Sequence, residues 1–323
     1  MVQVRWLGSA TVIRQRFTRA RAFGERCRSG LLFVTVTLVM GVGYVAIGIG
    51  TETVPPTVLA AFRFDVSAGV LLTYAVLSGH WRPRTTVDVL AIITLGELVF
   101  AGTIGFLFVG QQYTTASIAA VVMGLGPIVT IPIAYLLVPS ERLSRADIVG
   151  LLLGFFGVVI VANPSPAQAA TGANAGIVFV CCAVLSSSLG GVLLSRFETE
   201  LSPLALTGWG ALLGGTTLHV VTIGLGESTE TISWTPASIV VLVYLAVIVG
   251  IGGYAALLVL LSEVGPTRTS LTSFASPIVA IGAGWFLIGE VVTVTTLVGL
   301  VVVVGGFAVS NWSSLSQTLD RFG

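Results

Sequence analysis

Three ionisable side chains lie inside long apolar runs of this 323-residue sequence. Arg63 and Asp65 fall in the run 56–78, and Glu97 falls in the run 88–110. Runs of this length suit a bilayer, where a charge at the centre costs about 2.5–3.5 kcal/mol and therefore faces a cavity or a partner. One hypothesis makes Glu97 or Asp65 a proton or substrate-amine site, and makes Arg63 a counter-ion or carboxylate binder.

A purely structural role is equally expected for two of these residues. If the two runs are consecutive antiparallel helices, a rise of about 1.5 Å per residue leaves Arg63 and Glu97 less than about 10 Å apart in depth. An Arg63–Glu97 ion pair would then fix the packing of the two helices. Arg63 and Asp65 are separated by about 200° around a helix, so they cannot both face Glu97.

Weaker candidates are aromatic and hydroxyl side chains in other apolar runs, which would line a pocket between helices: Tyr44, Ser187, Trp209 and Tyr254. Intramembrane hydroxyls also bond from helix to helix, at about 0.6 kcal/mol on average. For the run Ser186–Ser188 we favour this packing role. Both roles stay open for Tyr44 and Tyr254.

Motifs for metal, cofactor or nucleotide chemistry are absent from the sequence. His80 and His219 are scattered, and the three cysteines form neither a metal nor a disulfide pattern. The sequence has no HExxH, no GxSxG in a strand–helix context and no nucleotide-binding loop. We therefore expect no metal, no cofactor, no enzymatic activity and no direct coupling to ATP.

Composition places these residues in a membrane protein. Hydrophobic residues make up 55% of the chain and charged residues 9%, with a mean hydropathy of +1.02. A soluble domain carries roughly 25% charged residues. The apolar residues form long runs without alternation, which is typical of membrane helices and not of a β-barrel. A net charge of +1 indicates no polyanionic partner such as nucleic acid.

The apolar runs predict an all-α polytopic membrane protein with ten transmembrane helices, each near the ~20 residues that a bilayer requires. The dipeptide Gly265-Pro266 separates the eighth run from the ninth. The predicted helices cover residues 31–50, 56–78, 88–110, 115–138, 147–162, 175–195, 203–225, 237–261, 266–289 and 293–311.

The sequence of the fourth and fifth predicted helices is repeated near the end of the chain. Gly126–Val161 matches Ser276–Asn311, with Glu141 corresponding to Glu290. A unit of five helices has an odd number of spans, so its two copies insert in opposite directions, which is the inverted-repeat architecture of secondary transporters. For Glu141 and Glu290 we favour a role in stabilising helix ends. The expected segments are a basic tail (1–30), a first five-helix repeat (31–162), an outer linker (163–174), a second repeat (175–311) and a C-terminal tail (312–323).

Arginine placement orients these helices. Residues 1–30 hold seven arginines, and every second loop after them carries arginine, whereas the intervening loops have none. By the positive-inside rule both termini are then cytoplasmic, and we place the protein in the plasma membrane. For residues 1–30 we favour a poorly ordered tail that helps to fix orientation, or a start codon placed too early. The alternative is an arm that binds the membrane surface or a partner.

Several short motifs recur in order along the chain. They are Ala60–Phe64 in the second predicted helix, Gln112–Ser117 between the third and fourth, and Glu141–Ser144 after the fourth, with a counterpart at Gly289-Glu290 that lacks the arginine and leucine. Together they resemble the EamA branch of the drug/metabolite transporter superfamily, over about residues 31–311. The resemblance implies a ten-helix carrier with two EamA repeats that moves small metabolites, often outward, without implying one substrate.

The sequence therefore predicts a secondary transporter that exports a small organic metabolite by alternating access of two inverted repeats. Its partners would be the substrate, the lipid bilayer and protons, which Glu97 or, failing that, Asp65 would carry. Burial favours the protonated form of a carboxyl group, whereas a nearby Arg63 favours the charged form. The rival hypotheses are a facilitator, a non-transporting sensor or assembly subunit, and an integral membrane enzyme. A homodimer is compatible with the sequence, but no feature indicates one.

Overall fold

The computed structural model describes residues 5–79, 81–138, 143–163, 173–227 and 232–312, and in the first helix it describes side chains from Arg28 onward. Throughout these ranges the chain forms helices and connecting turns, without a strand. A bilayer offers no water to the backbone, so apolar spans fold as helices that satisfy their own N–H and C=O groups. The predicted fold class, an all-α polytopic membrane protein, is confirmed.

Within the described ranges, nine helical segments of at least 18 residues are apolar enough to cross a membrane, and α15 adds one of 17 residues. They coincide closely with the ten predicted runs. The first half comprises α1 (Arg5–Thr51), α2 (Pro56–Leu77), α3 (Thr86–Ile93), η1 (Thr94–Gly102), α4 (Thr103–Gly110), α5 (Ala116–Met123), α6 (Gly126–Leu137) and α7 (Arg145–Ala162). The second half comprises α9 (Ala173–Leu194), α10 (Pro203–Gly224), α11 (Pro236–Val243), η3 (Tyr244–Gly253), α12 (Tyr254–Val264), α13 (Pro266–Thr269), α14 (Leu271–Ile288) and α15 (Val294–Ser310).

Polar caps and glycines fix where these helices begin and end. Thr85 and Ser144 each accept a hydrogen bond from the backbone N–H three residues later, and the side chains of Asp88 and Asp147 accept one from the cap residue in return. Such reciprocal capping boxes define helix starts at the membrane surface. Gly265, at φ +81°, ends α12, so the predicted break between the eighth and ninth spans is confirmed.

Two spans contain a π-helix in their middle. The third span runs α3–η1–α4, and its counterpart in the second half, the eighth span, runs α11–η3–α12. A π-helix closes its hydrogen bonds over five residues, is rare and frequently marks a functional site. Because π-helices occur at matching places in the two halves, the residues that follow them are candidates for the functional site.

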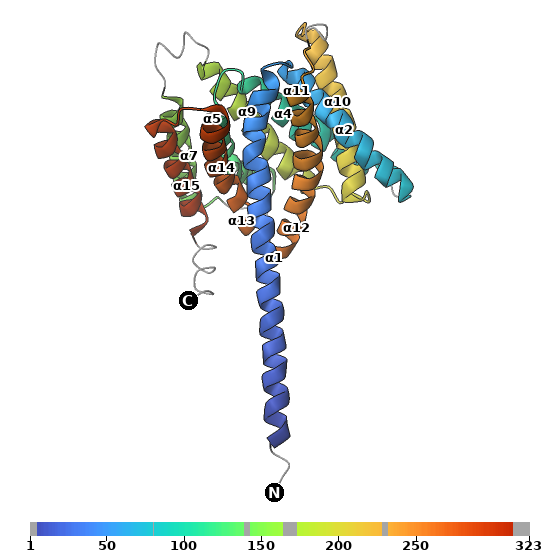
Figure 1. The fold of residues 1–323 in the computed structure, drawn as a ribbon, viewed down its shortest axis with the longest axis vertical. Coiled ribbons are helices and arrows are strands. Elements are labelled where there is room, and N and C mark those ends of the chain that lie inside the picture. Colours follow the sequence, from blue (N-terminus) through green and yellow to red (C-terminus); the bar gives the residue numbers. More distant parts are fainter. Residues whose placement is uncertain (1–4, 80, 139–142, 164–172, 228–231, 313–323) are drawn as a thin grey trace.

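The helices α7 and α15 are equivalent in the two halves and pack along each other at one edge of the bundle (Figure 1). A Cβ on Gly306 would lie 2.7 Å from the carbonyl oxygen of Gly150, and one on Gly299 would lie 2.8 Å from that of Gly157. Because the repeat pairs Gly150 with Gly299 and Gly157 with Gly306, exchange of the halves maps one contact onto the other. Gly150 and Gly157 are therefore points of close approach between the two helices.

The helix α1 continues from Thr51 back to Arg5 and projects well beyond the rest of the bundle (Figure 1). Residues 5–27, where the sequence predicts a poorly ordered tail, continue α1 as a helix. Where α1 enters the bundle, Arg28 pairs with Glu263 at 3.1 Å and the hydroxyl of Ser29 donates to the same carboxylate at 2.7 Å. These contacts tie α1 to the end of α12.

Candidate functional site

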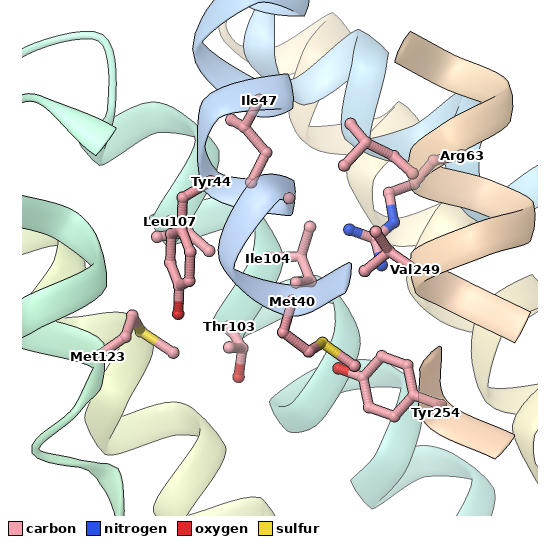
Figure 2. A pocket seen from close by; sticks show the side chains of 12 residues that line it. Met40, Tyr44, Ile47, Arg63, Thr103, Ile104, Leu107, Met123, Val249 and Tyr254 are labelled. Carbon is pink, nitrogen blue, oxygen red and sulfur yellow. The ribbon is translucent and has the colours of Figure 1, made fainter. Parts of the chain in front are cut away.

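A cavity of about 110 Å³ lies inside the bundle among α1, α2, α4, α5, η3 and α12 (Figure 2). We call it the central cavity. Both halves of the chain contribute to it, which is where inverted-repeat transporters place their substrate site. Its lining consists of Met40, Gly43, Tyr44, Ile47, Arg63, Thr103, Ile104, Leu107, Met123, Leu245, Val249 and Tyr254.

Arg63 is the one cation among the residues that line the central cavity, and it is only 3% exposed. Its side chain extends from α2 into the cavity (Figure 2), with Cζ 5.1 Å from the ring centre of Phe64 and 6.0 Å from that of Phe108. Its buried Nε has no hydrogen-bond partner within the described part of the chain. A buried charge without a counter-charge is costly, so the guanidinium is available to an anion.

Ser67, one turn further along α2, holds Arg63 in position. The Ser67 hydroxyl lies 2.9 Å from the carbonyl oxygen of Arg63 and 3.0 Å from that of Ala246 in η3, and so it fixes α2 against η3. Gly250 of η3 leaves space beside them, because a Cβ there would lie 3.0 Å from Ser67 Oγ and 3.8 Å from Arg63 Nη2. The arginine is thus positioned by residues from both halves.

Three hydroxyl groups give the central cavity its remaining polarity. Thr103 begins α4 directly after η1, and its Oγ1 donates to the carbonyl oxygen of Leu98, five residues earlier, at 3.0 Å. Tyr254 begins α12 directly after η3 and contacts Phe100 edge-on, with ring centres 6.3 Å apart. Tyr44 comes from α1. The other lining residues, Arg63 apart, are apolar, so the cavity presents one cation and three hydroxyls in an apolar wall.

A larger, open chamber of about 470 Å³ lies at the end of the bundle where α1 enters and α15 ends. We call it the serine chamber, after the four serines among its lining residues: Ser187, Ser188, Ser270 and Ser273. Met123 lines both the serine chamber and the central cavity. The central cavity and the serine chamber are therefore neighbours, with Met123 at their boundary.

Glu97 lines a third space, a lateral crevice of about 390 Å³ between η1, α4, α9 and α10. The crevice is almost entirely apolar, and three of its residues, Phe106, Val221 and Leu225, are exposed on the membrane-facing surface. Glu97 Oε1 accepts a hydrogen bond from Thr217 Oγ1 of α10 at 2.8 Å. Glu97 is the one ionisable residue in the lining of this crevice.

The predicted Arg63–Glu97 ion pair is wrong for this structure. The span α3–η1–α4 presents Glu97 to the lateral crevice and presents Thr103, Ile104 and Leu107 to the central cavity. The span itself therefore separates the carboxylate from the guanidinium. Arg63, from α2, lies on the central-cavity side of the third span, whereas Glu97 lies on the opposite side of that span, in the lateral crevice. Similar depth in the membrane therefore does not bring the two residues together.

Asp65 points away from the central cavity, as its angular offset from Arg63 predicts. Its Oδ2 lies 2.8 Å from Nε2 of His219 on α10, and the two side chains are 41% and 39% exposed. The ring of Phe62 contacts His219 edge-on at 5.5 Å between ring centres. The structure thus separates the two predicted carboxylates from each other and from Arg63.

The remaining predicted residues fall in different places. Tyr44 and Tyr254 line the central cavity and Ser187 lines the serine chamber. Trp209 lines none of the three spaces; its Nε1 donates to the carbonyl oxygen of Trp81 at 2.7 Å, and the two rings stack 6.2 Å apart.

The serine run also bonds between helices. Ser186 donates to the carbonyl oxygen of Leu98 at 2.8 Å, and Ser188 donates to that of Gly126 at 3.2 Å. These are the bonds expected of packing residues.

Sequence reasoning finds three of the twelve residues that line the central cavity, Tyr44, Arg63 and Tyr254, and misses the other nine, including Met40, Thr103 and Met123. Methionine and threonine are ordinary residues of an apolar helix, so their type carries no signal. Thr103 has one indirect signal, because the repeat offset places it within two residues of the counterpart of the predicted candidate Tyr254. The π-helices that precede both residues have no recognisable sequence pattern.

Glu290 joins two helix ends. It follows α14, and its Oε1 accepts a hydrogen bond from the backbone N–H of Ser117 near the start of α5, at 3.2 Å. This contact agrees with the helix-end role expected for Glu290. Its repeat counterpart, Glu141, lies outside the described residues.

Two five-span halves around a central cavity, with a buried arginine from one of them, are the features of a polytopic membrane transporter. The chain belongs to the EamA-like transporter family, whose model matches residues 28–163 and again residues 174–312. The two matches correspond to the two halves of the bundle. The resemblance that the sequence motifs indicate is therefore confirmed.

Curated relatives carry transporter names. The chain is 26% identical to an uncharacterized transporter of Archaeoglobus fulgidus, over 83% of this chain and 93% of that protein. It is 25% identical to a probable amino-acid metabolite efflux pump of Salmonella typhimurium, over 88% and 94% respectively. It is also 27% identical to the uncharacterized inner membrane transporter YedA of Escherichia coli, over 85% and 87%. One protein crystal structure aligns with a TM-score of 0.61 and 20% identity, over 88% of this chain and 98% of that one, and so shares the fold.

Proposed function

We propose that this transporter is a secondary carrier that exports a small organic metabolite across the plasma membrane by alternating access of its two halves. The observation that carries the proposal is the buried Arg63, whose Nε lacks a partner among the described residues, in a cavity between the halves that borders an open chamber at Met123. A scaffold without transport has no use for such a charge at this depth. The efflux-pump name of two relatives supports the outward direction.

The packing around the central cavity differs at its two ends. Toward the serine chamber the cavity borders an open space of about 470 Å³. Toward the opposite end, Val54, Val58 and Leu59 are at most 1% exposed, and a Cβ on Gly50 would lie 2.5 Å from Leu59 Cδ2. A cavity that is open on one side and tightly packed on the other corresponds to one of the two states of an alternating-access carrier.

We place the serine chamber on the cytoplasmic side. Arg82, Arg84, Arg145 and Arg196 all lie at the end of the bundle where α1 enters, and the loops at the other end carry no arginine. Short loops rich in arginine stay in the cytoplasm, which also places both termini there. The chamber is then the side from which an exporter loads its substrate.

Proton coupling through Glu97 stays our proposal for the energy source, with Asp65 as the alternative carrier. Glu97 lies in the middle of its span, in an apolar crevice, where its Oε1 accepts a hydrogen bond from the hydroxyl of Thr217. Because η1 and α4 separate Glu97 from the central cavity, proton binding would act on the substrate through movement of that span. A facilitator would use the same cavity without this linkage.

Export can be tested before the substrate is identified. Cells that overproduce the protein are compared with cells that overproduce Ile104→Phe, which fills the central cavity, and small metabolites are measured in cytoplasm and medium. We expect at least one metabolite to fall inside and rise outside only with the native protein. Identical metabolite profiles in the two strains would contradict export and favour a non-transporting role.

A further inference from the structure

We propose that the central cavity binds the carboxylate of a compact, largely apolar monoanion, held by the guanidinium of Arg63, and that it selects this monoanion over zwitterions and cations. The physiological meaning of this site rests on the proposed transport function, whereas the binding itself is a property of the cavity. Neither the family nor the names of the relatives assign this chemistry.

The charge of the cavity lining points to an anion. Arg63 is its one cation, and no carboxylate of the described residues lines the cavity: Glu97 lines the lateral crevice and Asp65 faces His219. The guanidinium cannot lose its proton, so it requires a counter-charge when it is buried. Within the described chain its Nε is buried without an acceptor, and a bound carboxylate would supply one.

The surroundings of the guanidinium favour a flat, two-oxygen anion. Phe64 and Phe108 lie within 5.1 and 6.0 Å of Cζ, at distances typical of cation–π contact. Contacts of this kind leave the in-plane N–H groups as the donors. These donors form a planar fork that matches the two oxygens of a carboxylate. A phosphate dianion carries more charge and more acceptors than one arginine can satisfy, so the carboxylate is the better match.

The same lining disfavours an ammonium group on the ligand. A zwitterion such as an amino acid would bring a second, positive charge into the cavity beside Arg63. The groups available to that charge are the hydroxyls of Tyr44, Thr103 and Tyr254, which do not neutralise it. A buried charge without a partner is costly, so the amino group should weaken binding.

The size of the cavity limits the rest of the ligand. An apolar protein cavity of about 150 Å³ binds benzene, which has six non-hydrogen atoms. A cavity of about 110 Å³ therefore suits a ligand of similar or smaller size, apart from groups that extend toward Met123 and the serine chamber. Ile47, Ile104 and Leu107 give this space an apolar wall. A short-chain monocarboxylate satisfies both the charge and the volume.

Four ligands with one carbon skeleton test the proposal directly: butanoate, butanamide, 2-aminobutanoate and butylamine. Their affinities are measured by titration calorimetry at neutral pH on the full-length protein in lipid nanodiscs. We expect butanoate to bind at least 10-fold more tightly than each of the others. Arg63→Gln should weaken butanoate binding about 10- to 100-fold, the range for loss of a charge-assisted hydrogen bond, and leave butanamide unchanged. Arg63→Lys should keep part of the preference, because it keeps the charge but loses the planar fork.

Two further variants locate the site independently of Arg63. Ile104→Phe should abolish butanoate binding by filling the cavity, whereas Val221→Phe should leave it unchanged because Val221 lines the lateral crevice. Gel filtration and ligand-free melting of each variant establish that it is folded.

The carboxylate assignment is overturned if butanoate does not bind, if butanamide, 2-aminobutanoate or butylamine binds equally well or better, or if Ile104→Phe retains butanoate binding. These results do not touch the export proposal, which is judged from the metabolite profiles of cells. If export is found but the exported solute is a cation or zwitterion, the carrier proposal stands and the carboxylate assignment fails. If Arg63-dependent butanoate binding is found without export, the carboxylate assignment stands and the carrier proposal fails.

Discussion

Thr103 and Tyr254 occupy equivalent places in the two halves: each is the first residue after a π-helix, and each lines the central cavity. The offset between them is 254 − 103 = 151, close to that between Glu141 and Glu290, 290 − 141 = 149. The duplicated unit therefore carries its unusual helix geometry with it. Both π-helices lie in spans that border the cavity, so they are the elements that we expect to adjust when access changes sides.

The first prediction concerns the close packing of α7 and α15. Gly306→Val should destabilise the protein by about 1–3 kcal/mol, because its Cβ would lie 2.7 Å from the carbonyl oxygen of Gly150 and the two helices must separate. Gly305→Val is the matched control, since a Cβ there meets no atom within 4 Å. Thermal unfolding in detergent measures both. Equal destabilisation by the two variants would show that the observed contact does not limit stability.

Much of this fold follows from the sequence because bilayer thickness and helix geometry restrict the choices. Apolar run length predicts the spans, and Gly265 predicts the break between the eighth and ninth because its backbone conformation ends α12. The GxxxG spacing of Gly150 and Gly154 is typical of close helix packing, and Gly150 does pack closely against α15. These features depend on local chemistry and on length alone.

The arrangement of the ionisable residues does not follow in the same way. The sequence predicts similar depths for Arg63 and Glu97, but their rotation about the helix axes decides whether they meet. Glu97 lies within η1, where π-helical turns change the direction of each side chain relative to an α-helix. No sequence signal marks that change. The direction of Asp65 can be predicted from the sequence, because its offset from Arg63 within α2 involves only regular helix geometry.

The second prediction concerns the stability of the ligand-free protein. Arg63→Met should raise the free energy of unfolding by about 1–3 kcal/mol. A buried, unpaired charge costs several kcal/mol, whereas the cation–π contacts that the change removes contribute about 2 kcal/mol. Chemical denaturation in detergent without ligand measures the difference. A clear loss of stability would indicate that Arg63 has a structural partner in the fold, and would argue against a free binding group.

The third prediction concerns which pairs of residues are energetically coupled. Glu97→Ala and Thr217→Val should show a coupling energy of about 0.5–3 kcal/mol in a double-mutant cycle, because their side chains share a hydrogen bond of 2.8 Å. Arg63→Ala and Glu97→Ala should instead add within about 0.5 kcal/mol, because a helical span lies between them. Strong coupling of Arg63 to Glu97, with none for Thr217, would restore the ion pair that the structure rejects.

The fourth prediction concerns proton coupling. Once the exported metabolite is known, proteoliposomes with an imposed pH gradient should move it uphill, and Glu97→Gln should abolish the uphill movement while leaving downhill movement intact. The reason is that glutamine keeps the size and the Thr217 hydrogen bond of Glu97 but cannot carry a proton. Asp65→Asn is the comparison variant. Uphill movement that persists in both variants would mean that neither carboxylate carries the coupling proton.

The fifth prediction concerns membrane orientation. In a protein whose native cysteines are replaced, a cysteine at Glu198 should react with an impermeant thiol reagent only from the cytoplasm. A cysteine at Ser233 should react only from outside. Both positions are exposed, and they lie in connections at opposite ends of the bundle. The opposite labelling pattern would reverse the orientation and place the serine chamber on the outer side.

Alternating access through the central cavity is tested most directly at Met123, which lines both that cavity and the serine chamber. Met123→Cys is labelled with the same reagent in sealed vesicles of each orientation, with Glu198→Cys and Ser233→Cys as markers of the two sides. We predict fast reaction from the cytoplasmic side and slower, measurable reaction from the outside, because a carrier exposes the cavity to each side in turn. Reaction from the cytoplasmic side alone, while both side markers behave as predicted, would contradict the account.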